Sequence, residues 1–479
     1  MFSRTTNRRP PLSSLHDFAT WEPVLRRLRA ANPEVLADPG GYVAGHIWRS
    51  GGCTMPWRRR QTRIDQTRSD PLQILQELQA LEADLEGVRK AMADLGLEGV
   101  SFKAEISPAG RAVVHVLNPG PASDSCAAIT GDGALVLVEG AVAEPRRRLP
   151  RPTPDAVPAP SADPELLART LRERLPAAVG ATEAEIAAAE ERLGLTLPEE
   201  LKALYRVTRV RSAEGDDEHE TYAAYEAVGC ELGSLDQLCF ADVASRPADW
   251  DTAARTALFT PPDAPVQGLV GSPGWLVFAG SGYGDPIAVD LTPGPGGHTG
   301  QIVLIDHEKH IGAVLLADSL TDLVASRGRY RPVTQAAEAP ALARIHTGAP
   351  DGVPAAAHPD LEVLDISRRQ GGTPISLGPF AALPRLRTLT AAPHTLADPL
   401  EVAGLTALEF LALASADWRV LLDAGAVPRS LLAAGIVRRD EDPLAVTDLA
   451  NELLALRNRP LITRTTVEGD LGPTEEQWA

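Results

Sequence analysis

Apolar residues in the middle third of the chain are spaced first as in helices and then as in strands. Three short helices are predicted, one after the N-cap Asp163, one after the capping box of Thr182 and Glu185, and one from Pro198. The runs WLVFA, IAVDL and GQIVLIDHE then have the rhythm of strands, and HIGAVLLADSLTDLV contains a fourth strand and a closing helix. Three helices are therefore expected to precede a strand-rich half.

The region before residue 145 predicts a small α+β unit. Leucine, valine and methionine residues recur at helical spacing between residues 72 and 97, which predicts an amphipathic helix. SFKAEISPAGRAVVHVL predicts a hairpin that turns between Pro108 and Gly110, and ALVLVEG predicts a third strand of the same sheet. We expect the helix to cover this sheet, although its apolar stripe would also allow it to dimerise and make the chain a scaffold.

Beyond residue 340 a different repeat of apolar residues begins. LEVLDI, LRTLTA and LEFLAL follow one another at intervals of 25 and 22 residues, and LARIHT is a weaker copy. This pattern resembles leucine-rich repeats, in which each unit buries its apolar face against its neighbours. The Asn or Cys that usually follows the leucines is absent, so an ordinary helical domain with Leu-rich strands is the alternative. WRVLLDAGAVPRSLLAAGIV and PLAVTDLANELLALRNRP are expected to be capping helices, and the tail after Val467 is expected to be loose.

The length of 479 residues predicts two to four domains. The proline-rich segment RRRLPRPTPDAVPAPSADP contains little that could enter a core, and we expect it to be an extended, semi-rigid linker. A weaker seam is TQAAEAP. The chain is thus predicted to be an α+β multidomain protein. Its parts are an N-terminal domain (1–145), this linker (146–164), a middle domain (165–335), a short leucine-rich-repeat-like domain (340–465) and a tail (466–479).

Three closely spaced glycines, Gly280, Gly282 and Gly284, interrupt the strand pattern of the middle domain. A dinucleotide loop needs a helix after its glycines, because the helix N-terminus binds the pyrophosphate. Here Asp285 and Pro286 lead into IAVDL, which has a strand pattern. The glycines therefore predict a tight turn with positive φ angles between two strands. An enzyme or a nucleotide-binding protein that uses the loop at residues 280–284 is the alternative.

The order of these segments resembles the SUKH superfamily, which includes the Smi/Knr regulators of fungal cell-wall assembly. The resemblance covers about residues 165–331 and is carried by LGLTLPEELKALYRV, WLVFAGSGYGDPIAVDL, PGPGGHTGQIVLIDHE and ADSLTDLV. Its most specific pieces are Leu197–Pro198 at a helix start, Gly-x-Gly-Asp before a strand that ends in Asp290, and Gly300 at the next strand. The resemblance implies a mixed sheet with flanking helices that binds other proteins, either as a regulator or, in bacteria, as an immunity protein. It implies neither catalysis nor a cofactor.

Charge is distributed unevenly along the chain, whose net charge is −18. Residues 1–68 contain twelve arginines and five acidic residues, whereas residues 165–335 contain 14 basic and 26 acidic residues. An acidic domain repels nucleic acid and attracts basic proteins, so the expected partner is another protein, such as a basic toxin domain. The acidic run is either a solvated face or the partner contact, through Glu214, Asp216, Asp217, Glu218 and Glu220.

Motifs for enzyme chemistry are weak in this sequence. HEKH at residues 307–310 lies between strands, without the helical spacing or the third ligand of a zinc site. Cys230, Cys239 and His219 lack an orienting third group, and the four cysteines are expected to be reduced and packed. Asp285 and Asp290 could bind a cation but are expected to cap turns. We expect no catalytic, cofactor-binding or metal-binding residue.

The sequence also bears on location. No run approaches the roughly 18 apolar residues needed to cross a bilayer. The first residues, MFSRTTNRRPPLSSL, are basic but lead into no apolar stretch of the kind found in signal peptides. A cytoplasmic protein without membrane contacts is expected, and its oligomeric state is left open.

Overall fold

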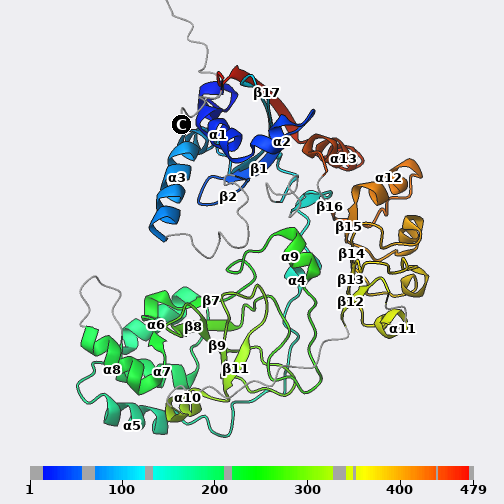
Figure 1. Cartoon of the computed structure of the whole chain (residues 1–479). Helices are drawn as coiled ribbons and strands as arrows, with labels where there is room; N and C mark the ends of the chain where they lie inside the picture. Colours follow the sequence, from blue (N-terminus) through cyan, green and yellow to red (C-terminus); the bar gives the residue numbers. More distant parts are fainter. Residues whose placement is uncertain are drawn as a thin grey trace, which may run out of the picture.

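The computed structural model of the chain describes residues 14–56, 71–124, 133–209, 218–326, 341–348, 352–438 and 441–473. Within these residues the strands form three separate sheets, each with its own apolar core. The sheets define an N-terminal, a middle and a C-terminal unit (Figure 1). None of the described helices is long and apolar enough to cross a membrane.

The N-terminal unit is a five-stranded antiparallel sheet covered on one face by helices. Its strands, in spatial order, are β17 (Thr463–Asp470), β4 (Arg111–Asn118), β3 (Gly99–Ile106), β1 (Val43–Trp48) and β2 (Cys53–Thr54). Its helices are η1 (Ser14–His16), α1 (Phe18–Ala31), α2 (Pro33–Ala37) and α3 (Pro71–Asp94). The second half of α3 buries Leu85, Val88 and Met92 against the sheet, whereas Leu75 and Leu78 in its first half are 52% and 40% exposed.

Two expectations for the N-terminal sheet were wrong. The segment predicted as its third strand, β5 (Ala134–Val136), pairs instead with the C-terminal sheet. Strand β17 extends from Thr463 into the tail that was predicted to be loose, residues 466–479; it pairs with the whole of β4 and turns Val467 into the core opposite Val114. β17 lies at the edge of the sheet and its sequence is mostly polar, so its pairing left little trace in the apolar pattern.

The middle unit is a six-stranded sheet packed against short helices. Its strands are β6 (Glu231–Leu232), β7 (Cys239–Phe240), β8 (Trp275–Gly280), β9 (Pro286–Asp290), β10 (Gln301–Leu304) and β11 (Val314–Ala317). Its helices are α5 (Pro164–Arg174), α6 (Glu183–Leu193), α7 (Glu199–Val207), α8 (Glu218–Val228), η4 (Leu235–Gln237), α9 (Trp250–Arg255) and α10 (Leu320–Ser326). The described strand pairs are all antiparallel, so the sheet is not mixed as the resemblance implied. The reason is that β8 to β11 follow one another through connections too short for a parallel crossover.

The caps predicted for the middle unit are present. Thr182 and Glu185 exchange the reciprocal hydrogen bonds of a capping box, and α6 ends at Gly194 with a left-handed φ of 69°. Leu201 and Leu204 are fully buried on α7. Local capping chemistry and one apolar face are therefore enough to place these helices.

The C-terminal unit contains five parallel strands in register. They are β12 (Leu342–His346), β13 (Val363–Ser367), β14 (Thr388–Ala391), β15 (Phe410–Ala414) and β16 (Ala433–Val437), and β5 pairs antiparallel with β16. The connections contain α11 (Gly352–Ala356), η5 (Gly378–Phe380), η6 (Pro399–Gly404), α12 (Ser415–Asp423) and, after β16, α13 (Pro443–Ala455). Leu364, Leu389, Leu411 and Ala434 are neighbours across the sheet and point into one core.

One predicted capping helix was too long. WRVLLDAGAVPRSLLAAGIV is helical only as far as Asp423, and its AAGIV portion is strand β16. Gly425 has a φ of 60°, and Pro428 follows, so the helix cannot continue. The apolar spacing was compatible with a helix, but the Gly and Pro residues end it.

Contacts join the middle unit to the segment before it and to the C-terminal sheet. The backbone N–H of Arg151 donates to Gln267 Oε1, and Gln267 Nε2 donates to the carbonyl of Arg151, each at 2.8 Å. Helix α4 (Glu144–Arg147) and α9 lie between the middle unit and the inner face of the C-terminal sheet (Figure 1). There the Trp250 ring stacks on Phe410 with centroids 6.2 Å apart. The segment at 146–164 is thus packed along the middle unit.

Candidate functional site

We call residues 281–285, which connect β8 to β9, the tip. The two strands last pair at Gly280 and Pro286, and the residues between them carry the turn. Tyr283 lies at its centre and is 84% exposed, more than any other large apolar or aromatic side chain in the described residues. An aromatic ring held in water in this way is available for contact with another molecule.

The tip is shaped by its own hydrogen bonds. Ser281 Oγ accepts from the backbone N–H groups of Tyr283 and Asp285, at 3.1 and 3.2 Å. The N–H of Ser281 donates to the carbonyl of Asp285 at 2.9 Å. Gly282 and Gly284 have φ angles of 84° and 96°, which other residues rarely adopt. Tyr283 therefore sits on a turn of defined shape.

Asp285 joins this tip to the segment after β10. Its Oδ1 lies 2.7 Å from His307 Nδ1 and accepts a second hydrogen bond from the His307 backbone N–H at 3.0 Å. The backbone N–H of His307 is the main cause that lowers the pKa of Asp285, and the Asp285 carboxylate raises the pKa of His307. The pair favours a charged histidine beside a carboxylate at the base of the tip.

The other predicted turn residues, Gly280, Asp290 and Gly300, lie in or beside strands and shape the fold. Gly280 is the last residue of β8 and does not have a positive φ, whereas Gly300 has a φ of 90° and donates its N–H to the Asp290 carbonyl at 2.8 Å. Asp290 is fully buried; its Oδ1 accepts from Thr292 N–H at 2.8 Å and its Oδ2 from Gln301 Nε2 at 2.9 Å. Burial raises the pKa of Asp290 to about 6. This carboxylate caps the turn after β9 from inside the unit.

The geometry of the glycine loop does not suit a nucleotide. The backbone that leaves Gly284 continues as strand β9 and not as a helix, so the loop does not lead into a helix N-terminus. The N–H groups of Ser281, Tyr283 and Asp285 are all donated inside the turn. A phosphate cradle combines several free amides with a helix dipole, and three of the amides here are already used while the chain continues as a strand.

Three possible metal ligands lie close together beside the tip. Asp285, Asp306 and His307 each place one ligand atom within 4.8 Å of the others. However, the Asp306 carboxylate accepts from Lys309 Nζ at 2.8 Å and from Glu308 N–H at 2.9 Å, and the nearer ring nitrogen of His307 is bonded to Asp285. These interactions favour an ion-pair network over a metal centre.

The cysteine positions also argue against nucleophilic chemistry. Cys230 is buried, and burial raises the pKa of its thiol to about 12, so it is protonated at neutral pH. Cys239 is exposed, which corrects the expectation of a packed environment. The side chain of His219 and the whole of Cys126 lie outside the described parts of the structure.

A buried serine and histidine pair occurs in the N-terminal sheet. His46 Nδ1 lies 2.9 Å from Ser101 Oγ, and the two residues are 0% and 1% exposed. Burial lowers the pKa of His46 to about 4, so the ring is neutral. Because no substrate can reach them, the pair belongs to the core of the fold.

The acidic run lies largely outside the described residues. This applies to Glu214, Asp216 and Asp217, while Glu218 and Glu220 fall in the first turn of α8, where their side chains are not described. Tyr222 on the same helix is 63% exposed and donates to Glu226 at 3.1 Å.

Sequence reasoning missed Tyr283 and Ser281 of the tip, and it considered His307 only as part of HEKH and not as the partner of Asp285. A tyrosine between two glycines is a visible signal, because a large ring in a tight turn has nowhere to be buried. The ion pair of Asp285 and His307 was not visible, since it joins residues 22 positions apart that meet only in the folded sheet.

Residues 180–326, which include this tip, match the SMI1 / KNR4 family (SUKH-1). The predicted SUKH domain is therefore confirmed over that range. The chain is also similar to the cell wall biosynthesis/cell cycle regulator smi1 of Schizosaccharomyces pombe, with 31% identity over 164 residues. The similarity covers 29% of this chain and 30% of the relative. The chain thus spans about three tenths of the length of the curated relative it matches.

Proposed function

We propose that the chain is a non-catalytic protein-binding protein whose SUKH unit contacts its partner through the tip between β8 and β9. The observation that carries this proposal is Tyr283, 84% exposed on a hydrogen-bonded turn inside the region that matches the family. Tyrosine is enriched among the residues that dominate binding energy, because its ring buries a large area at little entropic cost. A turn that is already ordered adds little further cost on binding.

The charges around the tip favour a basic partner. Glu231 lies beside Gly282, within about 3.3 Å of where a Cβ would stand, and Asp285 and Asp306 lie at the base. His307 pairs with Asp285 at 2.7 Å, and Lys309 pairs with Asp306 at 2.8 Å. Each cation offsets one carboxylate, so Glu231 supplies the remaining negative charge. A negative rim on a chain of net charge −18 attracts a basic surface and accelerates its association.

The family and the relative suggest two roles for the binding event. The name of the fission-yeast relative describes a regulator, and the SUKH resemblance includes immunity proteins that neutralise toxins. Both roles require a protein partner and neither requires catalysis. A basic regulatory target and a basic toxin domain would each fit this surface.

The other units are proposed to support this module. Under this proposal the chain has three folded units, and residues 146–164 pack against the middle unit. The C-terminal unit is a short leucine-rich-repeat-like solenoid. Its five parallel strands recur every 21 to 25 residues by their first positions, as expected of such repeats. Its inner face is not wholly available as a second binding surface, because α9 covers it at Thr388 and Phe410.

The experiment is affinity capture of partners from the organism's own lysate with the full chain as bait, compared with two tyrosine variants. Tyr283→Ala is expected to reduce recovery of a specific partner about tenfold or more. Tyr222→Ala, which removes an exposed tyrosine from α8 of the same unit, is expected to leave recovery unchanged. Equal recovery by all three baits would refute the proposal that the partner contacts the tip. Loss with Tyr222→Ala alone would move the contact to α8 and the acidic run.

A further inference from the structure

A pocket of about 340 Å³ lies where the segment after α4 meets the middle unit and the C-terminal unit. Its walls come from residues 144–151, from the chain between α9 and β8, and from Arg385 of the C-terminal unit. Ligand sites concentrate at junctions of this kind and have volumes from about 300 Å³ upward. Neither the tip nor the family match accounts for this pocket.

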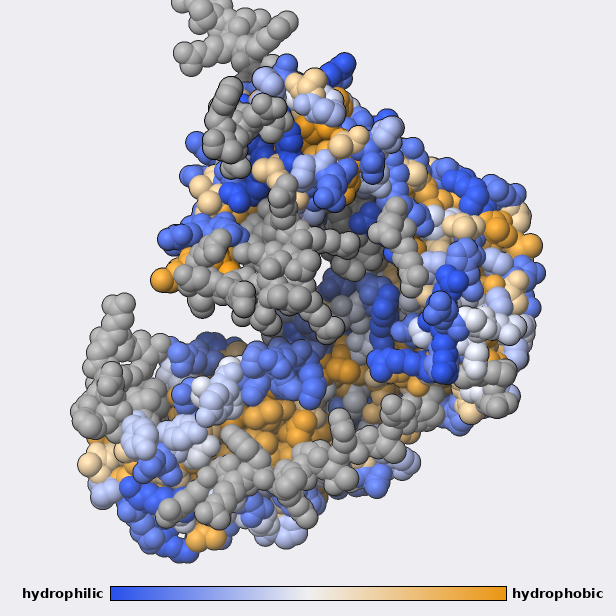
Figure 2. Space-filling model, in the orientation of Figure 1, coloured by the Kyte–Doolittle hydropathy of each residue, from blue (hydrophilic) through white to orange (hydrophobic). Residues whose placement is uncertain are grey.

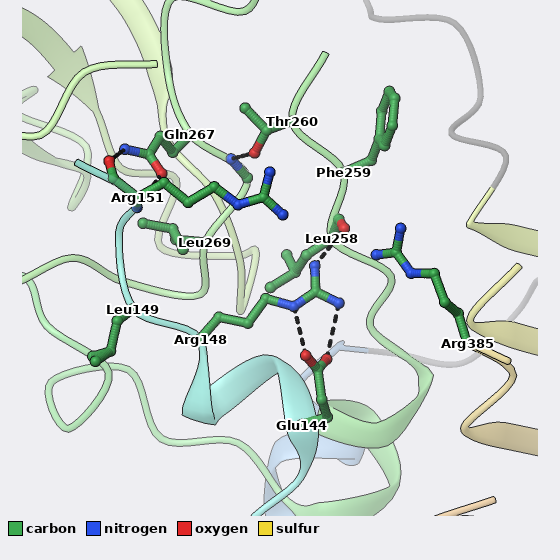
Figure 3. A pocket seen from close by; sticks show the side chains of 11 residues that line it. Glu144, Arg148, Leu149, Arg151, Leu258, Phe259, Thr260, Gln267, Leu269 and Arg385 are labelled. Carbon is green, nitrogen blue, oxygen red and sulfur yellow. Dashed lines mark hydrogen bonds and ion pairs between the residues drawn. The ribbon is translucent and has the colours of Figure 1, made fainter. Parts of the chain in front are cut away.

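Three arginine side chains point into it. Figure 3 shows Arg148, Arg151 and Arg385 directed toward a common space beside Leu258 and Phe259. The guanidinium group is a planar fork that binds phosphate or carboxylate oxygens through two parallel hydrogen bonds. Guanidinium groups that converge on one space bind an anion through those N–H groups that the protein does not already use.

Two of these arginines are held in place by carboxylates. Arg148 binds both oxygens of Glu144, at 2.8 and 2.9 Å, and its third nitrogen donates to the Leu258 carbonyl at 2.6 Å. Arg385 binds Asp360 at 3.0 Å and Glu362 at 2.5 Å. Both groups are fixed before any ligand arrives, so little ordering cost falls on binding.

Arg151 is different, because its backbone is fixed and its charge is not used. Its N–H and carbonyl are both bound by the Gln267 side chain at 2.8 Å. Among the residues that the structure describes, none forms an ion pair with its guanidinium. Around the pocket, Arg148, Arg385 and Arg387 are balanced by Glu144, Glu362 and Asp360. Arg151 therefore leaves one positive charge uncompensated.

An apolar surface adjoins the arginines. Phe259 is 37% exposed, Leu149 is 77% exposed, and Leu258 and Leu269 line the space between them. Exposed apolar groups beside a cationic site suit a ligand that has an anionic head and an apolar body. A simple inorganic anion would use the arginines and leave this surface wet.

We propose that the pocket binds a small organic anion, namely a phosphate monoester with a flat apolar body. A phosphate monoester carries nearly two negative charges at neutral pH and offers enough oxygens for the Arg151 fork and for the N–H groups that Arg385 does not give to Asp360 and Glu362. Arg151 and Arg385 bind the phosphate from opposite sides, and Phe259 packs against the body. The ligand ties the middle unit to the C-terminal unit, because Arg151 lies on the segment bound to Gln267 of the middle unit and Arg385 belongs to the C-terminal unit.

The test is calorimetric titration of the full chain with phenyl phosphate, inorganic phosphate and phenol. Phenyl phosphate is expected to bind saturably, inorganic phosphate at least tenfold more weakly, and phenol not at all. Arg151→Gln is expected to weaken the binding of phenyl phosphate at least tenfold, because it removes the guanidinium charge that no carboxylate in the described structure compensates. Arg169→Gln, which removes an exposed arginine from α5, is the matched control and is expected to have no effect.

A second variant separates the two parts of the site. Phe259→Ala is expected to weaken the binding of phenyl phosphate but not that of inorganic phosphate. Circular dichroism checks that each variant is folded. Absence of saturable phenyl phosphate binding by the folded wild-type chain would overturn the proposal. Equal weakening by Arg151→Gln and Arg169→Gln would also overturn it, since it would show only a general effect of net charge.

Discussion

The carboxylate of Glu362 lies 2.7 Å from the guanidinium of Arg148, a residue 214 positions earlier in the chain. Glu362 comes just before β13, and its side chain is 2% exposed. It also binds Arg385 at 2.5 Å and Arg387 at 3.2 Å. One buried carboxylate thus ties the C-terminal sheet to the segment that leads into the middle unit.

Glu362→Gln is expected to destabilise this junction strongly. The substitution removes the charge that compensates three arginines, and breaking a buried ion pair from one side typically costs about 3–5 kcal/mol. Denaturant unfolding of the full chain measures the loss. Asp360→Asn is the control, because Asp360 binds only Arg385 of the same arginines, in a half-exposed pair worth less than about 1 kcal/mol. Similar losses from both substitutions would contradict a special role for Glu362.

Gly284→Ala is expected to destabilise the tip, and Gly280→Ala is not. Gly284 has a φ of 96°, and forcing a side chain into that conformation costs about 1–2 kcal/mol. At Gly280 a Cβ would meet nothing closer than 3.9 Å, and the backbone is ordinary strand. Thermal unfolding of the two variants compares them directly. The same melting temperature for both variants would show that residue 284 does not require a positive φ.

Asp290 gives the middle unit a definite dependence on pH. Its pKa is about 6 in the folded protein against an ordinary value of 3.8, so the folded protein binds the proton more tightly. The stabilisation that comes from protonated Asp290 is fully present below about pH 4. It is lost as the pH rises through 6, and the loss reaches up to about 3 kcal/mol.

Asp290→Asn removes this titration. The difference in unfolding free energy between wild type and variant, measured at pH 4 and pH 7, is expected to shift in favour of the variant at pH 7. Use of the difference cancels the other titrating groups, which are common to both proteins. A difference that stays constant with pH would mean that Asp290 titrates normally.

The parts of the fold that were predicted correctly depend on neighbouring residues. The capping box at Thr182 and the stop at Gly194 are read from a few consecutive positions, and the structure contains both. The SUKH domain was found because several such local signals occur in a fixed order. Short-range chemistry was therefore sufficient for α5, α6, α7, the strands β8 to β11 and α10, whereas α8, β6, β7 and α9 were not predicted.

The errors concern partners that are distant in sequence. Strand β5 was assigned to the wrong sheet, since three apolar residues carry no information about which edge they will join. β17 pairs with a strand about 350 residues before it, and its alternating polar residues resembled a loose tail. Pairing of this kind is decided by which sheet edges remain free after the units have folded.

The candidate site shows the same division. The turn at the three glycines was expected, whereas the contact of Asp285 with His307 was not. Likewise, no signal in the sequence indicated that Arg387 of the C-terminal unit donates to the carbonyls of Ala254 and Thr256 in and after α9. Nothing in the local sequence of α9 indicates that its C-terminus is bound by an arginine from another unit.

Trp250→Ala tests how far α9 couples the two units. Trp250 is 6% exposed, stacks on Phe410 and donates its indole N–H to the Ala141 carbonyl at 3.2 Å. Its truncation leaves a cavity at the interface and is expected to cost about 3–5 kcal/mol. Because the cost falls on the contact between units, heat should unfold the middle and C-terminal units in two separate steps in the variant and in one step in the wild type. Phe259→Ala, on the loop after α9, is the control and should keep one step. A single step in the Trp250 variant would show that α9 follows the sheet without coupling it to the middle unit.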